Sequence, residues 1–483
     1  MTSPEMRGHA ENRLSEGGLR PLAEVMASIG VDRAFHGDAV LRGGDPLTDS
    51  PHKYVEAHAT TELLVGACAA AVDGGRNGGG ASGVELSVDA VPALHAMHTP
   101  HYVWHGRTYS EVGAEHVPCN GMFRTKDDRH VMFCAGPPYQ KLVNGYLRML
   151  ECAYTRESVT GAVSQYTADE LAEECVKAGV PGVKCCTPEE WHAHPQGEVL
   201  AQAALIGIEK IAAGPAVALR GSVNGPLGGV RVLDFTHVLA GPRTAQTLTL
   251  YGATSLHISA LAFPDTVQQH LGVDVGKYCA YLDLRKKDEH ATMLRLCEDA
   301  DVFLSNYRGT VHQRYGLTPH ELVERSSRGV IVVSINCYGP AGPWSGLPGF
   351  DPNAQAATGF CVNEGSLAEP RTSPVFYTAD ITTSDLAASG AMAALLRRAE
   401  EGGSFHVTVS LARSAMWVDS LGLVDHTARA GLPAQDTYPY ETDTIHNSYG
   451  ELTRLTPALQ ITGMPLHRPT RLVPYGADVA AWP

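Results

Sequence analysis

Two aspartates that each precede a run of small residues are the side chains best suited to covalent chemistry. Asp351 lies in GLPGFDPNAQAATGF, and Asp380 lies in VFYTADITTSDLAASG. An aspartate at a helix start can cap the first backbone N–H groups, and the helix dipole favours its ionised form. An ionised carboxylate can attack a thioester as a nucleophile. We therefore expect Asp380 to stay ionised and to react, while an N-cap role remains open for both residues.

Groups able to hold phosphate follow several predicted strands. The loop HVLAGPRTAQ (237–246) comes after one strand and opens a helix, so its backbone N–H groups could face a phosphate or a carbonyl, although it lacks G-x-G-x-x-G. Arg285, Arg308 and Arg314 follow later strands. They could form a solvated rim, but their clustering in an acidic chain favours phosphate contacts. The Gly-rich stretch 74–83 lacks the Gly-Lys-Ser/Thr ending of a phosphate-binding loop and indicates a flexible turn.

Metal and disulfide sites are not indicated. The densest histidine cluster is interrupted by Pro100 and has no nearby carboxylate to complete a ligand set; its members are His95, His98, His101 and His105. The 11 cysteines are scattered and form no C-x-x-C motif, so we expect free thiols. No metal ion is therefore predicted.

The elements that must position these side chains show a regular rhythm in the second half of the chain. Short β-branched runs predict strands, and helical patterns at 286–299 and 318–326 fill two of the gaps between them. This alternation predicts an α/β fold with a doubly wound, mostly parallel sheet, whose ligand site lies beyond the carboxyl ends of the strands. The predicted strands are 229–235, 253–259, 279–284, 300–306 and 329–336.

Changes in composition divide the chain into five parts. Residues 1–50 lack periodicity and predict a loosely packed lead-in, and residues 213–228 are rich in Gly, Ala and Pro and predict a linker. Between them, 51–212 is a first folded region. Residues 229–425 are the predicted ligand-binding domain, and 426–483 an extended tail.

One segment of the first region resembles a segment of the second. Residues 60–90 match 383–413 at a constant offset of 323, in helix, Gly-containing turn and strand. Chance similarity between two Ala-rich helices is the alternative, but the shared order favours duplication. At this offset Asp380 corresponds to Ala57, so we expect one active centre rather than two.

Composition excludes several classes of function. The chain has 483 residues, of which 44% are hydrophobic and 18% charged, as in folded globular proteins of two or three domains. A net charge of −15 argues against nucleic-acid binding. The polar first 20 residues do not resemble a signal peptide, and no stretch of 18 uncharged apolar residues occurs. We therefore expect a soluble, cytoplasmic protein without a membrane partner.

Several of these motifs together resemble the family III CoA-transferases, the group of formyl-CoA transferase, carnitine CoA-transferase and α-methylacyl-CoA racemase. They are GVRVLDFTHVLAGP, LDLRKKDE, ADVFLSNYRGTVHQRYGL, VIVVSINCYGPAGPWSGLPGFDPNAQAATG and TADITTSDLAASGAMAALLRR. The first region resembles the later part of the same family, including its smaller α+β domain, so the usual order is permuted. The resemblance implies a Rossmann-like sheet and an interlocked homodimer.

The resemblance also implies roles for individual residues. Asp380 matches the aspartate that attacks acyl-CoA and passes coenzyme A through an aspartyl thioester to a carboxylic acid. Asp351 matches an acidic residue near the substrate. Coenzyme A and acyl-CoA are then substrates, and no tightly bound cofactor is implied. The positions that match the CoA site are His237, Val238, Leu239, Ala240, Leu282, Arg285, Asn306, Tyr307, Arg308 and Arg314.

The sequence departs from the family at two places. The family's usual glutamate and arginine after the second strand are Ser259 and Ala260 here, which would weaken CoA binding. The histidine that the racemases place before the second aspartate is Phe350, which disfavours a two-base racemase. An acyl-CoA racemase or isomerase and a non-catalytic CoA-binding protein remain the alternatives to a CoA-transferase.

Overall fold

The computed structural model describes most of the chain, and its largest element is a seven-stranded sheet. The strand order is β12 (Tyr278–Tyr281), β11 (Thr254–Ser259), β10 (Arg231–Phe235), β13 (Val302–Ser305), β14 (Ile331–Asn336), β15 (Ser404–Ser410) and β9 (Gly207–Ala212). All neighbours are parallel except β9, which runs antiparallel to β15. The predicted doubly wound sheet is confirmed. The residues described are 11–77, 83–96, 103–104, 107–108, 117–136, 139–219, 224–375, 377–464 and 466–483.

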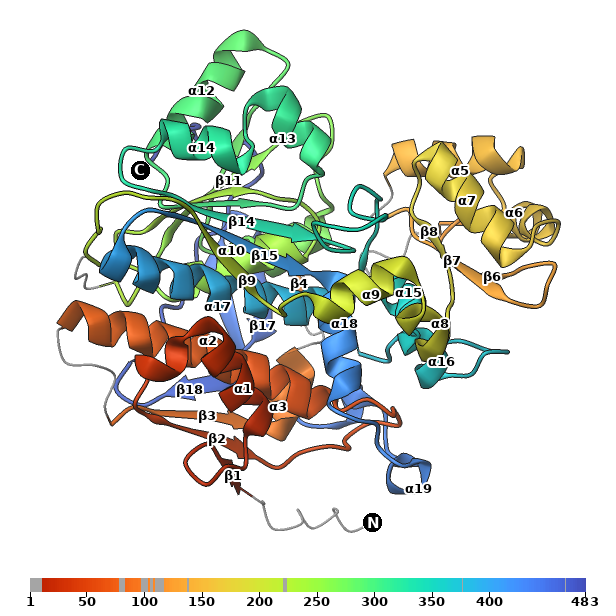
Figure 1. The fold of residues 1–483 in the computed structure, drawn as a ribbon, viewed down its shortest axis with the longest axis horizontal. Helices are drawn as coiled ribbons and strands as arrows, with labels where there is room; N and C mark the ends of the chain where they lie inside the picture. Colours follow the sequence, from red (N-terminus) through yellow and green to blue (C-terminus); the bar gives the residue numbers. More distant parts are fainter. Residues whose placement is uncertain are drawn as a thin grey trace.

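Helices cover both faces of this sheet, because its strands are apolar on both sides (Figure 1). One face is covered by α12 (Lys287–Glu298) and α14 (Pro319–Arg325), whose buried Met293, Leu296 and Leu322 pack on β10 to β13. The other face is covered by α10 (Ala240–Leu250) and α17 (Thr378–Glu401). Both helices predicted at 286–299 and 318–326 are thus confirmed. Further helices near the sheet are α11 (Val267–Val273), α13 (Gly309–Tyr315), α15 (Asp351–Ala357), α16 (Phe360–Glu364) and α18 (Leu411–Ser420).

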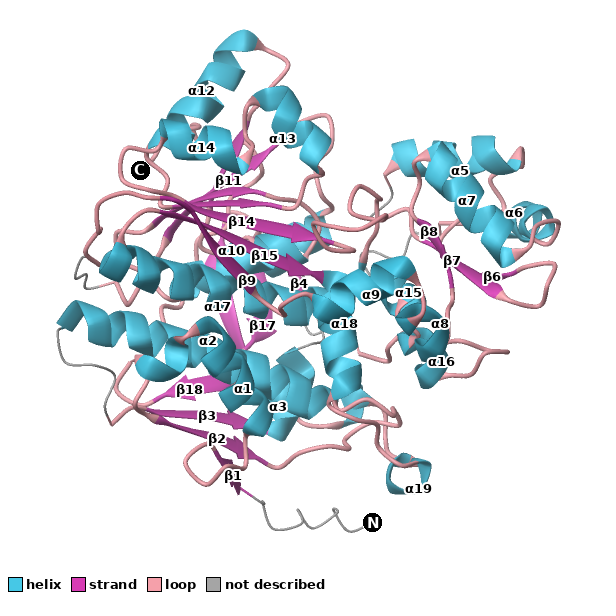
Figure 2. Ribbon diagram, in the orientation of Figure 1, coloured by secondary structure: helices cyan, strands magenta, loops and turns pink. Residues whose placement is uncertain are grey.

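A second sheet and helix layer pack against α17 (Figure 2). The layer contains α2 (Tyr54–Asn77), α1 (Arg20–Ile29) and α3 (Ala90–Ala96), and below it the strands run in the order β1 (Glu11–Arg13), β2 (Asp38–Arg42), β3 (Glu85–Asp89) and β18 (Leu459–Ile461). The loosely packed lead-in predicted for 1–50 is wrong for residues 11–50. Leu22, Val25, Met26 and Ile29 bury one face of α1, and their helical spacing is already present in the sequence.

The duplication is larger than the sequence comparison indicates. The order β2, α2, β3, α3 recurs as β14, α17, β15, α18, with β2 and β3 parallel like β14 and β15. Helices α2 and α17 start at residues 54 and 378, a difference of 324, whereas α3 and α18 start at 90 and 411, a difference of 321. The constant offset of 323 is therefore wrong, because the turn between helix and strand differs in length.

The smaller α+β domain, on the right of Figure 1, has its own core. Its sheet runs β6 (Gly121–Arg124), β7 (His130–Phe133) and β8 (Gly182–Lys184), covered by α5 (Gln140–Leu150), α6 (Arg156–Val163) and α7 (Ala168–Ala178). Helices α8 (Pro188–His192) and α9 (Pro195–Gln202) then return the chain to β9. Since β9 joins the large sheet, the predicted region 51–212 does not fold apart from the second half.

The C-terminal segment adds strands rather than only an extended tail. A four-stranded sheet has the order β16 (Thr442–Asn447), β17 (Gly450–Leu455), β4 (Val103–Trp104) and β5 (Arg107–Thr108). In the described ranges three short helical segments remain: η1 (Val31–Arg33), α19 (His426–Arg429) and η3 (Gln435–Thr437). Residues 213–219 of the predicted linker form neither helix nor strand. Among the described helices, none combines the length and apolarity needed to cross a membrane.

Candidate active site

Asp380 lies in the first turn of α17, close to the carboxyl ends of the parallel strands. Nearly every residue from Thr378 to Leu396 is buried, because α17 is packed between the sheet and α2. Tyr377 occupies the N-cap position of this helix without a side-chain cap, and Asp380 is the third helical residue. Asp380 is 8% exposed, so its carboxylate is almost enclosed by protein.

Asp351 caps the helix of Asp380 from a different element. One oxygen of its fully buried carboxylate accepts the backbone N–H groups of Ala379 at 2.7 Å and Asp380 at 3.1 Å. Gln355 donates to the other oxygen. Asp351 is itself the first residue of α15, so neither aspartate is the N-cap of its own helix. Asp351 thus orients Asp380 through the backbone.

The two carboxyl groups have raised pKa values. Burial raises the pKa of Asp380 well above its usual range, the neighbouring Asp351 charge adds to this, and the Ala240 N–H opposes it. Burial also raises the pKa of Asp351 to about 6. The hydrogen bonds from the Asp380 and Ala379 N–H groups and from Gln355 lower this pKa and so oppose the effect of burial. Desolvation therefore works against the ionised form of Asp380 that the helix dipole favours. Asp351, with three donors, takes the negative charge first.

The 237–240 loop meets Asp380 at the point where the strand order reverses. It follows β10. From β10 the chain continues to β11 on one side and later enters β13 on the other side. Such a switch point is where α/β sheets bind ligands. Leu239 and Ala240 are buried, and the Ala240 N–H faces the Asp380 carboxylate. Because Ala240 begins α10, that N–H is also part of a helix N-terminus.

Asn306, after β13, holds the loop in place. Its side-chain oxygen accepts the His237 backbone N–H at 3.0 Å and lies 2.8 Å from His237 Nδ1, while its amide donates to the His237 carbonyl at 2.7 Å. The Tyr307 ring stacks on the His237 ring with centroids 4.6 Å apart. The structure therefore brings His237, Asn306 and Tyr307 together, as the sequence predicts.

The predicted phosphate contacts are more dispersed. Leu282 is buried beside Ser259, whose carbonyl accepts its N–H at 3.1 Å. Arg285 is exposed and already paired with Asp283 at 2.8 Å. Arg308 and Arg314, at α13, are exposed and form no ion pair with any described acid. All of them follow β12 or β13, so they lie at the predicted edge of the sheet. Of the three predicted arginines, Arg308 and Arg314 remain available for an anion.

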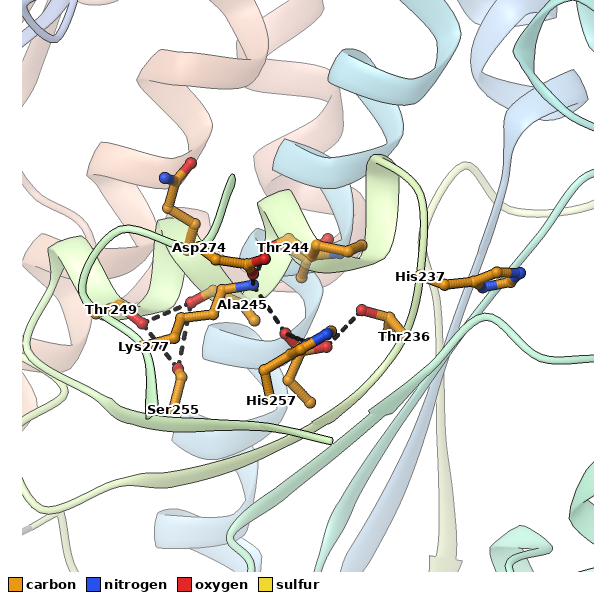
Figure 3. A network of polar contacts seen from close by, with 12 residues as sticks. Thr236, His237, Thr244, Ala245, Thr249, Ser255, His257, Asp274 and Lys277 are labelled. Carbon is orange, nitrogen blue, oxygen red and sulfur yellow. Dashed lines mark hydrogen bonds and ion pairs between the residues drawn. The ribbon is translucent and has the colours of Figure 1, made fainter. Parts of the chain in front are cut away.

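A buried charge network supports the start of α10 from below (Figure 3). Lys277 Nζ lies 2.8 Å from both Asp234 and Asp274, and it donates to the Pro242 carbonyl at 2.7 Å. His257 Nδ1 lies 3.0 Å from Asp234, and the Thr236 hydroxyl donates to the same residue. The network ties β10, β11 and the first turn of α10 together.

Within the described part of the chain, two groups of histidine and carboxylates have the spacing of metal ligands. In the group of Asp234, His257 and Asp274, the Lys277 ammonium pairs with both carboxylates and supplies the positive charge that a metal ion would bring. The other group is His58, Glu62 and Asp385, where Arg243 lies 3.9 Å from both acids. Of the predicted histidine cluster, His95 lies 3.1 Å from the Tyr438 carbonyl; His98, His101 and His105 lie outside the described residues.

The first repeat reproduces part of the Asp380 site. Asp45 accepts the N–H groups of Val55 at 3.1 Å and Glu56 at 2.8 Å, as Asp351 does in α17, and both acids precede a proline. Because these caps are hydrogen bonds, they align the two repeats without depending on the residue at which each helix is taken to begin. Glu56, not Ala57, is thus the counterpart of Asp380. It pairs with Lys53 at 3.1 Å, and this repeat has no counterpart of β10 and its 237–240 loop among the described residues.

Sequence reasoning missed two residues next to the loop. Asp265, between β11 and α11, accepts the Val238 N–H at 2.8 Å, and Tyr139 of the small domain donates to Asp265 at 2.6 Å. The Tyr139 ring also lies near the rings of His237 and Phe350. No local motif indicates either residue, because they are distant in sequence and meet only through the fold.

Comparison with known proteins agrees with the sequence motifs. Residues 227–447 match the CoA-transferase family III. Over 210 residues the chain is 35% identical to "Acetyl-coenzyme A transferase nodX" of Hypoxylon pulicicidum, covering 42% of this chain and 35% of that protein. It is 31% identical over 283 residues to an "Acyl-CoA transferase" of Gibberella moniliformis, covering 56% and 49%.

A solved structure is also similar in part. The crystal structure of Rv3272 from Mycobacterium tuberculosis shares 30% identity, covers 41% of this chain and 58% of that one, and has a TM-score of 0.38. The chain spans about a third to a half of the length of the two fungal relatives.

Proposed function

Because residues 227–447 of this chain belong to CoA-transferase family III, we propose that the protein transfers coenzyme A from an acyl-CoA to a carboxylic acid through a covalent intermediate on Asp380. The observation behind the proposal is the placement of one enclosed carboxylate against the Ala240 N–H at the switch point of the sheet. Its substrates are an acyl-CoA and a free acid, and no tightly bound cofactor takes part.

The proposed reaction starts with attack of the ionised Asp380 on the thioester carbon. The new C–O bond gives a tetrahedral oxyanion, which backbone N–H groups at the start of α10 stabilise. The C–S bond then breaks, leaving a mixed anhydride and the CoA thiolate. The thiolate attacks the Asp380 carbonyl carbon, so the donor acid leaves as a carboxylate and Asp380 becomes a CoA thioester.

The second half repeats these steps with the acceptor. The acceptor carboxylate attacks the aspartyl thioester and expels the CoA thiolate, which forms a new mixed anhydride. The thiolate attacks the acceptor carbonyl, yielding the new acyl-CoA and free Asp380. The raised pKa of Asp380 means that the acid must lose its proton before attack. Asp351 and the Ala240 N–H then orient the carboxylate.

Trapping with hydroxylamine tests the proposal. The protein is mixed with acyl-CoA and hydroxylamine without acceptor acid, digested, and searched by mass spectrometry for a hydroxamate within residues 378–397. Fragment ions separate Asp380 from Asp385, a second buried aspartate of the same helix that serves as internal control. We expect modification of Asp380 only, and none in Asp380→Asn. Transfer activity without a hydroxamate at Asp380 would exclude the covalent step.

A further inference from the structure

Asp265 contacts the candidate active site at a backbone position rather than at a reacting atom. It lies in the loop between Ser259 and Val267, after the position where the family's glutamate and arginine are replaced. One carboxylate oxygen accepts the Val238 N–H at 2.8 Å, and the other accepts the Tyr139 hydroxyl at 2.6 Å. The proposed mechanism assigns it no role, although its partner Val238 is two residues from the Ala240 N–H.

Val238 needs such a partner because its backbone is unfavourable. Its φ of 70° lies in the left-handed region, which a β-branched residue rarely adopts. Strain of this kind persists only where the surroundings hold it, and it is concentrated at functional sites. Asn306 holds the preceding residue, His237, on both its N–H and its carbonyl. Asp265 accepts the hydrogen bond from the N–H of Val238 itself.

The conformation of Val238 decides where the next N–H groups point. Leu239 follows with φ of −133° and ψ of −64°, and Ala240 begins α10. A relaxed Val238 would rotate the peptide planes that follow and turn the Ala240 N–H away from Asp380. A backbone donor contributes to catalysis only if it is held in place before the charge develops. Asp265 therefore acts on the Asp380 carboxylate indirectly, through the backbone from Val238 to the Ala240 N–H.

Tyr139 links the same carboxylate to the small domain. It lies at the start of α5, and its ring is 6.2 Å from the His237 ring and 6.4 Å from the Phe350 ring, measured between centroids. Burial and the negative charge of Asp265 raise the pKa of Tyr139, so the phenol keeps its proton and acts as the donor. The small domain is thus fastened to the loop that faces Asp380.

We infer that Asp265 is a positioning residue for the proposed acyl transfer: it fixes the left-handed Val238 that aims the Ala240 N–H at Asp380, and its bond from Tyr139 couples this loop to the small domain. The inference rests on the proposed function for its catalytic consequence. Its structural part, the fixed Val238 backbone, stands separately.

Two substitutions at Asp265 separate a positioning role from a general effect on folding. Asp265→Asn keeps an oxygen that can accept the Val238 N–H, whereas Asp265→Leu has similar size and no acceptor. We expect the leucine variant to lose between about 10-fold and 100-fold in kcat, with a smaller change in KM for acyl-CoA. The asparagine variant should recover most of this loss. Asp288→Leu, in the exposed first turn of α12, is the matched control.

Hydrogen exchange provides a readout that does not depend on activity. In Asp265→Leu the amides of Val238 and Ala240 should exchange faster than in the wild-type protein, while those of β14 should not change. Tyr139→Phe should show a smaller increase, since the Asp265–Val238 bond remains. If Asp265→Leu does not fold, the same measurement on Asp265→Ala replaces it.

The outcomes discriminate between the two proposals. If wild-type protein forms no Asp380 hydroxamate, the proposed function fails, and the exchange rates alone decide the role of Asp265. If wild-type protein forms the hydroxamate and Asp265→Leu forms it equally fast, the positioning role is overturned. Equal losses of kcat in the leucine and asparagine variants would also overturn it, because an acceptor oxygen would then make no difference.

Discussion

At the scale of residues, the site is a pair of carboxyl groups with unequal tasks. Asp351 has three hydrogen-bond donors, two of them backbone N–H groups in the helix that contains Asp380. Asp380 has the Ala240 N–H and the Asp351 charge as neighbours, in addition to its burial. Like charges at short range cannot both ionise freely. Burial and the Asp351 charge therefore raise the pKa of Asp380, and the Ala240 N–H opposes them.

This arrangement predicts the pH dependence of turnover. Because Asp380 must be ionised to attack, the rate should fall as the pH is lowered through a pKa above the usual range of an aspartate. Asp351→Asn keeps an oxygen for the two N–H groups but removes the negative charge, so the pKa of Asp380 should decrease. We expect the acidic limb of the kcat profile to move to lower pH in this variant. An unchanged limb, or a shift to higher pH, would show that Asp351 does not influence Asp380 through its charge.

The Asn306 side chain is a second residue whose contribution can be measured. It makes three contacts to His237, including both backbone groups. Asn306→Leu leaves a backbone N–H and a carbonyl without partners, so we expect the free energy of unfolding to fall by about 1–3 kcal/mol. Calorimetric binding of CoA should weaken in the same variant. Unchanged stability and affinity would mean that the loop does not depend on Asn306.

At the scale of elements, five strands of the large sheet could be predicted from the sequence. The contacts of this sheet with the N-terminal layer and the small domain could not. The five runs 229–235 to 329–336 are strands because β-branched residues suit a sheet buried on both faces. By contrast, the prediction missed α1, although Leu22, Val25, Met26 and Ile29 recur at helical spacing. The meeting of Tyr139 with Asp265 joins residues 126 positions apart, and only the fold brings such residues together.

The Lys277 network predicts that the stability of the elements around α10 depends on one buried cation. Lys277 is fully buried between Asp234 and Asp274 and also donates to the Pro242 carbonyl. Lys277→Met would leave two buried carboxylates without their cation, so the free energy of unfolding should fall by about 3–5 kcal/mol. Lys286→Met, which removes an exposed pair with Glu289, should change urea unfolding little. Similar losses in both variants would contradict a special role for the network.

At the scale of the whole molecule, two related halves share one core. Helix α2 packs on α17, its counterpart in the duplication, and β9 adds a strand from the first half to the sheet of the second. The repeated Asp-Pro before each helix was readable in the sequence, at Asp45 and Asp351. Its capping role was not, because the first N–H that the aspartate accepts is 10 residues away in the first repeat and 28 residues away in the second. We still expect one active centre, since among the described residues α17 meets a loop like 237–240 and α2 does not.

The shared core predicts cooperative unfolding. Burial of α2 against α17 leaves neither half with a complete core, so far-UV circular dichroism and tryptophan fluorescence should report the same thermal midpoint. Trp191, buried in the return segment, and Trp417, buried in α18, place fluorescence probes on both halves. Two separate transitions would show that the first and second halves are independent folding units.

If Asp380 carries the covalent intermediates, one oxygen of the acceptor acid must end on its carboxylate, and an acceptor acid labelled with ¹⁸O in its carboxylate can follow that oxygen. When the labelled acid attacks the aspartyl thioester and the CoA thiolate later cleaves the mixed anhydride, one acceptor oxygen stays on Asp380. After a single turnover, mass spectrometry should find one ¹⁸O in the peptide with Asp380 and none at Asp385. If labelled oxygen appears only in the released donor acid while Asp380 stays unlabelled, acceptor and donor react directly, and the covalent account is wrong.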